Sequence, residues 1–147
     1  MAVLGKINDY LPLKPNSVSD PDIYLGTKLK QTRLDNGIWA WVLSPSKYVN
    51  QAVKNCEDHL RENHGGKYTL PRKAENPFRM GYEPELDEST PLNAELSSYY
   101  QSIIGVMWWM VELGWIDIAT EVSLLSSHLA YPREGHFEEA LHIMAYL

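Results

Sequence analysis

The chain has 147 residues, of which 44% are hydrophobic, and a formal net charge of −6. This length fits one domain or parts of two, and the hydrophobic fraction is typical of a globular protein. The single cysteine, Cys56, excludes a disulfide framework within the chain, and the N-terminus lacks the apolar run of a secretory signal. We therefore expect an intracellular protein, cytoplasmic or nuclear, that is not secreted and has no membrane partner.

The charges are distributed unevenly along the chain. Residues 28–73 carry nine Lys or Arg against four acids, whereas residues 74–147 carry two against twelve. A basic middle beside an acidic end is compatible with a nucleic-acid surface in the middle of the chain. It is equally compatible with a solvated helix face followed by acidic loops.

Residues 1–21 contain three prolines and are expected to be irregular. Residues 22–43 predict a β-hairpin, because two apolar segments flank Asn36-Gly37, a pair that favours a type I′ turn. The second strand is apolar on both faces, so we expect both faces of it to be covered. Gly26, inside the first strand, indicates a bulge or a close approach of another backbone.

Residues 44–65 predict an amphipathic helix, with Ser44 as N-cap, Pro45 as the first helical residue and Gly65-Gly66 as its end. The expected buried stripe consists of Val49, Ala52, Val53, Cys56 and Leu60. Cys56 lies on that stripe, which favours a small buried residue over a nucleophile. Residues 66–92 combine four prolines with an acidic run and predict an ordered surface loop or a mobile linker.

The longest apolar stretch, residues 98–130, predicts two helices that fold back on each other at Gly114. The first runs from about Asn93, its N-cap, to Leu113 and is expected to be buried on more than one side. The second runs from about Ile116 to Leu129, with Asp117 as N-cap. Charges interrupt the stretch, so it is not a membrane span, and it contains no catalytic group. We interpret its periodicity as core packing.

Residues 133–147 predict a last helix, which follows Pro132 and buries Phe137, Ala140, Leu141 and Met144. The helical pattern continues to the final residue, so we expect a truncated reading frame or a shortened chain. The predicted fold class is α+β, mostly helical: an N-terminal β-hairpin followed by about four helices.

The sequence holds no glycine-rich phosphate loop and no nucleophile elbow. His128, His136 and His142 are spaced by eight and six residues without the pattern of a zinc site. The acidic pairs Asp87-Glu88 and Glu138-Glu139 are expected to be solvated. We therefore expect no metal site, no cofactor and no self-contained active site in this chain.

Two long segments carry a resemblance to a known family. Residues 98–114 read Ser-Tyr-Tyr-Gln-Ser-Ile-Ile-Gly-Val-Met-Trp-Trp-Met-Val-Glu-Leu-Gly, and residues 116–136 read Ile-Asp-Ile-Ala-Thr-Glu-Val-Ser-Leu-Leu-Ser-Ser-His-Leu-Ala-Tyr-Pro-Arg-Glu-Gly-His. Together they resemble the C-terminal part of the Ty1/copia-type reverse transcriptase of retrotransposon Pol polyproteins. Tyr-Leu-Gly at 24–26 and Leu-Ser-Pro-Ser-Lys-Tyr-Val at 43–49 extend this resemblance, by their order and spacing, over almost the whole chain from about Asp22.

The resemblance implies three parts within an incomplete polymerase fold. Residues 1–43 would be a palm-edge tail with the hairpin that grips the primer strand, and residues 44–92 an amphipathic helix with its connector. Residues 93–147 would be a thumb-like helical bundle leading toward a ribonuclease H domain. The implied partners are an RNA–DNA or DNA duplex, the rest of the polymerase palm and the ribonuclease H domain.

The candidate nucleic-acid-binding residues lie on the hairpin and on the helix that follows it. A glycine in the first strand permits close approach of a nucleic-acid backbone, and lysines and arginines neutralise phosphates. The candidates are Tyr24, Leu25, Gly26, Lys28, Lys30, Arg33, Lys47 and Lys54.

Two departures from the family pattern limit the expected activity. The family's catalytic carboxylates, which hold Mg²⁺ in the complete polymerase, lie on the palm upstream of the matched segments, and this sequence has no Asp-Asp pair. Trp115 stands where the family has an arginine, so the charged contacts of that arginine are lost. We expect a catalytically inactive fragment of an RNA-directed DNA polymerase. The alternative is a helical protein–protein interaction module derived from a decayed retroelement, with Trp109 or Trp115 as its exposed aromatic group.

Overall fold

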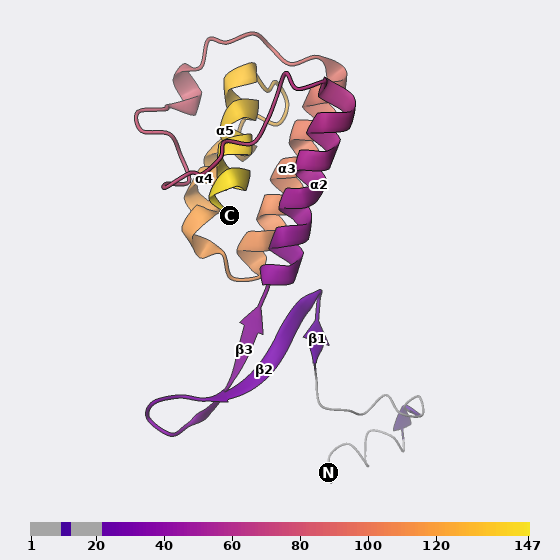
Figure 1. Cartoon of the computed structure of the whole chain (residues 1–147), viewed down its shortest axis with the longest axis vertical. Helices are drawn as coiled ribbons and strands as arrows, with labels where there is room; N and C mark the ends of the chain where they lie inside the picture. Colours follow the sequence, from indigo (N-terminus) through magenta and orange to yellow (C-terminus); the bar gives the residue numbers. More distant parts are fainter. Residues whose placement is uncertain (1–9, 13–21) are drawn as a thin grey trace.

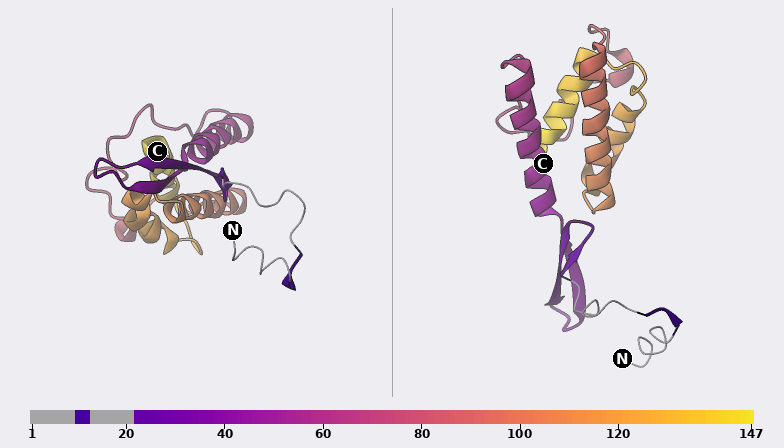
Figure 2. Two further views of the ribbon diagram at one scale, coloured as in Figure 1. Left: turned by 90° about the horizontal axis from the view of Figure 1, so that it is seen from below. Right: turned by 90° about the vertical axis from the view of Figure 1, so that its right-hand side faces the viewer.

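The computed structural model describes residues 10–12 and 22–147, in which a small sheet projects from one end of a group of helices (Figures 1 and 2). The strands are β1 (Ile23–Tyr24), β2 (Thr27–Arg33) and β3 (Trp39–Ser44). The helices are α2 (Ser46–His64), α3 (Ala94–Glu112), α4 (Ala119–Ser126) and α5 (Glu134–Tyr146). The predicted α+β class, a hairpin followed by four helices, is confirmed. The irregular structure predicted for residues 1–21 falls almost wholly outside the described residues.

In place of the predicted two-stranded hairpin, the structure has a three-stranded antiparallel sheet in the order β1-β2-β3. The expected first strand is divided by a two-residue turn, in which Leu25 has φ 50° and Gly26 has φ 82°, closed by the pair Tyr24 and Thr27. Positive φ at both central residues is the requirement of a type I′ turn. Gly26 therefore occupies a turn, and its expected place inside a strand is wrong.

The second turn also differs from its prediction. The Leu34 N–H donates to the Ile38 carbonyl, and the Gly37 N–H donates to the Leu34 carbonyl, both at 2.8 Å. Gly37 has φ 82°, whereas Asn36 is not among the described residues with positive φ. This combination is typical of a three-residue loop, a type I turn followed by a left-handed glycine. The Asn36 carboxamide instead accepts a hydrogen bond from the Ile38 N–H at 3.1 Å.

The sheet is uncovered on both faces by the described residues, so the expectation of double cover for β3 is wrong. Trp39 is 63% exposed, Trp41 50% and Leu43 49%, while Ile38 and Val42 on the other face are also exposed. The sheet projects beyond the end of α2, where the other helices do not reach it (Figure 2). An uncovered surface of this kind marks an interaction site more often than a free monomer surface.

Helix α2 begins at Ser46, one residue later than predicted. Ser44 is the last residue of β3, and Pro45 occupies the N-cap position, with its carbonyl accepting from the Val49 N–H at 3.1 Å. The helix therefore starts without a side-chain cap. Its end matches the prediction, because Gly65 takes a left-handed conformation with φ 51°.

Helix α3 buries six of its residues in the core, and its predicted bounds are confirmed. The Asn93 carboxamide accepts from the Leu96 N–H at 2.9 Å, and Gly114, with φ 111°, reverses the chain after the helix. Met110 is fully buried, whereas Trp109 is 37% exposed, so the apolar surface is less completely covered than predicted. The fully enclosed Tyr100 hydroxyl donates to the Leu125 carbonyl of α4 at 2.7 Å.

The second helix of the apolar stretch is shorter than predicted. Residues Ile116–Ile118 form a 3-10 turn, and α4 begins only at Ala119. Asp117 is not an N-cap; its carboxylate accepts from the Tyr146 hydroxyl of α5 at 2.9 Å. The four helices share one core, which includes Val49, Cys56, Leu60, Ile103, Ile104, Met107, Ile118, Val122, Phe137, Leu141, Ile143 and Met144.

The connector between α2 and α3 is an ordered loop that packs against the N-terminus of α5. It contains a 3-10 turn at Pro84–Leu86 and a bridge between Pro91 and Arg133. The Thr90 carbonyl accepts from the Glu134 N–H at 2.9 Å, and the Ser89 hydroxyl accepts from the Gly135 N–H at 2.8 Å. The connector therefore satisfies N–H groups that the first turn of a helix leaves unpaired.

Acidic side chains that were expected to be solvated hold this packing together. Glu139 is completely buried, and its two oxygens accept from the Arg79 N–H at 2.5 Å and from Arg79 Nε at 2.6 Å. Asp87 accepts from the Tyr82 hydroxyl at 2.6 Å and from the Ser89 N–H at 2.8 Å. Burial alone would raise the pKa of Asp87, but the bonds from Ser89 and Tyr82 outweigh it and lower that pKa. The prediction of solvation holds only for Glu138 and Glu88, which are exposed.

A pair of histidines lies under the same connector. His136 is buried; its Nδ1 accepts from the Arg133 N–H at 3.0 Å, so that Nε2 carries the proton donated to the Pro84 carbonyl at 3.0 Å. The His128 ring lies 4.1 Å from the His136 ring between centroids. Burial, and then the neighbouring His136, lower the pKa of His128, although Glu85 and Asp87 act in the opposite direction.

Replacing Gly135 by alanine should destabilise the chain, although alanine is the better helix former. A Cβ at this position would collide with the Asp87 carboxylate, which is fixed by Tyr82 and Ser89. We expect Gly135→Ala to lower the free energy of unfolding by about 1–3 kcal/mol, measured by urea denaturation. Gly105→Ala in α3 is the matched control, because nothing lies within 4 Å of its Cβ. An increase in stability in both variants would contradict the packing described for Asp87.

The lowered pKa of His128 makes stability depend on pH. Because the folded pKa lies below the ordinary value of about 6.5, the unfolded chain binds more protons in the window between the two. The free energy of unfolding should therefore fall as pH falls below about 6.5, and the slope should diminish in His128→Gln. Asp87 contributes in the same direction only below about pH 4, the ordinary range of aspartate. Equal slopes for both proteins between about pH 6.5 and 5 would contradict the prediction.

Candidate functional site

The basic residues predicted from the sequence meet where the sheet joins α2. A hollow of about 560 Å³ is lined by Lys28 of β2 and by Lys47 and Lys54 of α2. Its other lining residues are Ser44, Ser46, Asn50 and Gln51. All seven lining residues have polar or positively charged side chains, and none of the seven is acidic.

The local structure explains this convergence. Lys28 is paired with Ser44 across the sheet, so both side chains lie on the same face. On α2 the five lining residues 46, 47, 50, 51 and 54 follow helical spacing and share one face of the helix. Because α2 follows β3 after one residue, the two faces adjoin.

The remaining cations are divided between the two faces of the sheet. Lys30 is paired with Val42 and lines a second hollow, of about 510 Å³, that also includes Lys28 and Asp22. Arg33 alternates to the opposite face, where it is paired with Trp39, and its Nε donates to the Gly37 carbonyl at 3.1 Å. The structure thus brings Lys28 together with Lys47 and Lys54 in one hollow, and Lys30 lies beside Lys28 in the second. Arg33 lies apart from both, on the opposite face of the sheet.

The predicted residues Tyr24, Leu25 and Gly26 form the β1–β2 turn described above. Tyr24 is 59% exposed and Leu25 is 54% exposed, and nothing lies within 4 Å of the position of a Cβ on Gly26. A leucine in the left-handed region is strained, because its Cβ approaches the following carbonyl. Strained exposed turns of this kind occur preferentially at functional sites.

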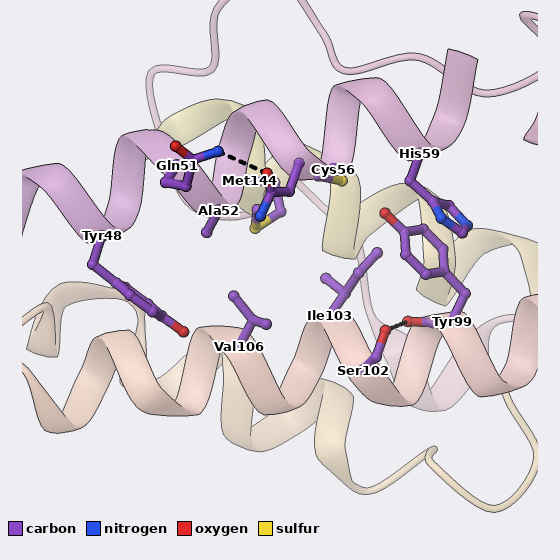
Figure 3. Close-up of a pocket in the computed structure, with 11 residues that line it drawn as sticks. Tyr48, Gln51, Ala52, Cys56, His59, Tyr99, Ser102, Ile103, Val106 and Met144 are labelled. Carbon is purple, nitrogen blue, oxygen red and sulfur yellow. Dashed lines mark hydrogen bonds between the residues drawn. The ribbon is translucent and has the colours of Figure 1, made fainter. Parts of the chain in front are cut away.

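A separate cavity of about 320 Å³ lies between α2 and α3 (Figure 3). Its walls are mainly apolar and include Ala52, Cys56, Ile103 and Val106, with Met144 of α5 behind them. The rings of His59 and Tyr99 stack at one end, with centroids 3.7 Å apart. The sequence offered no signal for this pair, because its partners lie 40 residues apart.

Cys56 lies in this cavity but has the properties of a core residue. Burial raises the pKa of its thiol, and only the hydrogen bond with Tyr99 opposes that shift. Burial and the bond to Cys56 likewise raise the pKa of Tyr99. The thiol therefore stays protonated at neutral pH, and nucleophilic chemistry at this position is disfavoured.

The described residues show no group of side chains suited to holding a metal ion and no helix suited to spanning a membrane. Within residues 10–12 and 22–147, no three His, Cys, Asp or Glu side chains are grouped so that they could hold a metal ion. None of the helices in this part of the chain is both long and apolar enough to cross a bilayer.

Comparison with known proteins gives one informative similarity. No family model matches the chain, and no solved structure matches it. Over its full length the chain is 29% identical to a Ty5-1 transposon protein of Saccharomyces cerevisiae. The chain is similar to a transposon protein. It spans 38% of that protein's length, so the similarity indicates a transposon origin for a segment of this size and carries no activity with it.

Leu25→Asn tests whether the β1–β2 turn is strained. Asparagine tolerates the left-handed conformation, and Leu25 is largely exposed, so little packing is lost. We expect the free energy of unfolding to rise by up to about 1 kcal/mol, measured by thermal and urea denaturation. Leu34→Asn is the control, since Leu34 is also exposed in the hairpin but is not among the described residues with positive φ. A gain in stability for Leu34→Asn as large as that for Leu25→Asn would contradict the assignment.

Proposed function

We propose that the chain is the primer–template-contacting segment of a retrotransposon RNA-directed DNA polymerase of the Ty1/copia type, inactive by itself. The observation that carries the proposal is the basic hollow at the junction of the sheet and α2, in a chain similar throughout to a transposon protein. Three lysines without an acid among the lining residues suit contact with successive backbone phosphates.

The proposed contact is electrostatic and independent of sequence. Lys28 and Lys30 on one face of the sheet would lie along one strand of a duplex, while Lys47 and Lys54 extend the same positive surface onto α2. The exposed turn at Tyr24, Leu25 and Gly26 lies at one end of β2 and would approach the sugar–phosphate backbone. Lysines of this kind fix position on a duplex and do not read bases.

Catalysis would require groups that this chain does not supply. Two-metal phosphoryl transfer needs carboxylates that hold Mg²⁺, and the sequence contains no Asp-Asp pair. In the proposed parent enzyme the palm would hold Mg²⁺, and this segment would hold and orient the duplex. The palm and a ribonuclease H domain are the proposed intramolecular partners.

A second candidate function is a protein–protein interaction module. It is favoured by the exposed aromatic residues, although the most exposed tryptophans are Trp39 and Trp41 on β3 rather than the predicted Trp109 and Trp115. The two functions differ in their dependence on salt, because phosphate contacts release counterions and apolar contacts do not.

Binding of a fluorescently labelled RNA–DNA duplex, measured by anisotropy at several salt concentrations, tests the first function. We expect Lys47→Gln/Lys54→Gln to reduce the slope of log K against log salt by roughly 2. We also expect it to weaken binding on the order of tenfold at about 0.1 M salt. Arg72→Gln/Lys73→Gln removes the same charge from the exposed connector, outside the hollow, and is the matched control.

The two variants distinguish binding at the hollow from a general effect of charge. Unchanged binding in the control with weakened binding in the α2 variant would support the hollow as the site. Equal loss in both variants would indicate a general charge effect, and binding that does not depend on salt would contradict the proposal.

A further inference from the structure

Strand β3 leaves one of its two edges without a partner among the described residues. It is paired with β2 on one side, and the strand order β1-β2-β3 makes it the outer strand of the sheet. Its six residues, Trp39–Ser44, include no charge and no proline. Natural sheets usually protect such an edge with charges, prolines or a covering segment, because an unpaired edge is a template for another strand.

The hydrogen-bond pattern identifies the backbone groups that face outward. The Leu34 N–H bonds to the Ile38 carbonyl, so in an antiparallel ladder Ala40 and Val42 also bond to β2. The intervening Trp39, Trp41 and Leu43 then direct their N–H and C=O groups to the free edge. The Leu29 N–H supports this alternation, because it bonds to the Asp22 carbonyl on the far side of β2.

The side chains beside this edge are apolar on both faces. Trp39, Trp41 and Leu43 lie on one face, and Ile38 and Val42 on the other, and all five are at least 43% exposed. A strand that paired here would therefore bury side chains above and below the sheet in addition to forming backbone hydrogen bonds.

We propose that β3 pairs antiparallel with β3 of a second copy of this chain, forming a continuous six-stranded sheet across a two-fold axis. An antiparallel pair of identical strands places the same residues on both sides of the axis. Because β3 carries no charge, no like charges meet across the new ladder.

The opposite edge of the sheet explains why the association would stop at two copies. β1 has only two residues, and beside it β2 carries Lys28, Lys30 and Arg33. Short strands and lysines are the features that prevent pairing at an edge. The contact is therefore isologous and closed, which gives a dimer and not a fibre.

The area available fits a reversible dimer. The exposed parts of the five apolar side chains amount to on the order of 500 Å² per copy, given about 150–250 Å² for an aromatic residue. Two copies would then bury at most about 1,000 Å² of these side chains, which is at the small end for a specific interface. We expect a dimer that dissociates in the micromolar range and is insensitive to salt.

Sedimentation velocity of the full 147-residue chain without nucleic acid tests the proposal. Between about 5 and 200 µM, the mass should rise from 16.8 kDa toward twice that value, equally in low and high salt. A monomer at all concentrations would overturn the proposal, as would a series of larger species. A monomer whose tryptophan emission is quenched only by a single-stranded oligonucleotide would also overturn it, because the face would then bind bases.

Leu43→Pro and Leu43→Ala separate the backbone edge from the side chain. Proline at position 43 removes the N–H that faces the free edge. It leaves the hydrogen bonds to β2 intact, and proline is tolerated at such edge positions. We expect Leu43→Pro to remain monomeric at about 200 µM and Leu43→Ala to retain a weaker dimer. Dimerisation of Leu43→Pro at the strength of the unmodified chain would overturn the proposal.

Hydrogen exchange keeps the test valid if the proline variant fails to fold. In the unmodified chain the amides of Trp41 and Leu43 should exchange several-fold more slowly at about 200 µM than at about 5 µM protein. The amides of Ala40 and Val42, which bond to β2 in both states, are the internal control. Equal exchange of all four amides at both concentrations would contradict pairing at this edge.

Discussion

Burial of α5 is the constraint on which the rest of the helical structure depends. Seven of its thirteen residues are buried, including His136 and Glu139, and its first turn lies against the connector. A buried helix terminus whose N–H groups lack partners is unstable, and a buried carboxylate without a cation is more so. The connector supplies both, through Ser89 and Thr90 at the terminus and through Arg79 at Glu139. Its route across the helices is therefore fixed by polar bonds, although it contains little regular structure.

The helices and the sheet differ in how completely their apolar side chains are buried. In the helical part the buried His136 and Glu139 of α5 have hydrogen-bond partners, and the apolar residues of four helices share one core. The sheet, by contrast, exposes two tryptophans, a strained turn and a row of lysines. Stability therefore resides in the helices, while the surfaces available for binding are on the sheet and on the first half of α2. This division supports placing both proposed interactions at that end of the molecule.

The parts that sequence reasoning predicted well depend on local signals. The bounds of α3, the cap at Asn93 and the reversal at Gly114 follow from periodicity, a capping side chain and a residue that permits positive φ. To predict that Lys28 lies beside Lys47 and Lys54, one must know the register of the hairpin. The register depends on the turn type, and the predicted type I′ turn at Asn36-Gly37 was wrong. The partners of Glu139, Asp87 and His59 lie far away in sequence or in an irregular loop. No periodic pattern predicts such contacts, because tertiary packing decides them.

The lysine face of the sheet and the free edge of β3 can bind their proposed partners at the same time, because they lie on different parts of the sheet. Lys28 and Lys30 alternate with Leu29 along β2, so the basic side chains lie on the face opposite to Trp39, Trp41 and Leu43. Pairing at the edge of β3 uses its outward backbone groups and the five apolar side chains beside them, of which Ile38 and Val42 share the face of Lys28 and Lys30. None of these five residues lines the hollow at α2, so a duplex there and a second copy at the edge would use different residues. In such a dimer the two lysine faces would be related by the two-fold axis, and their positive charges would lie on one continuous sheet.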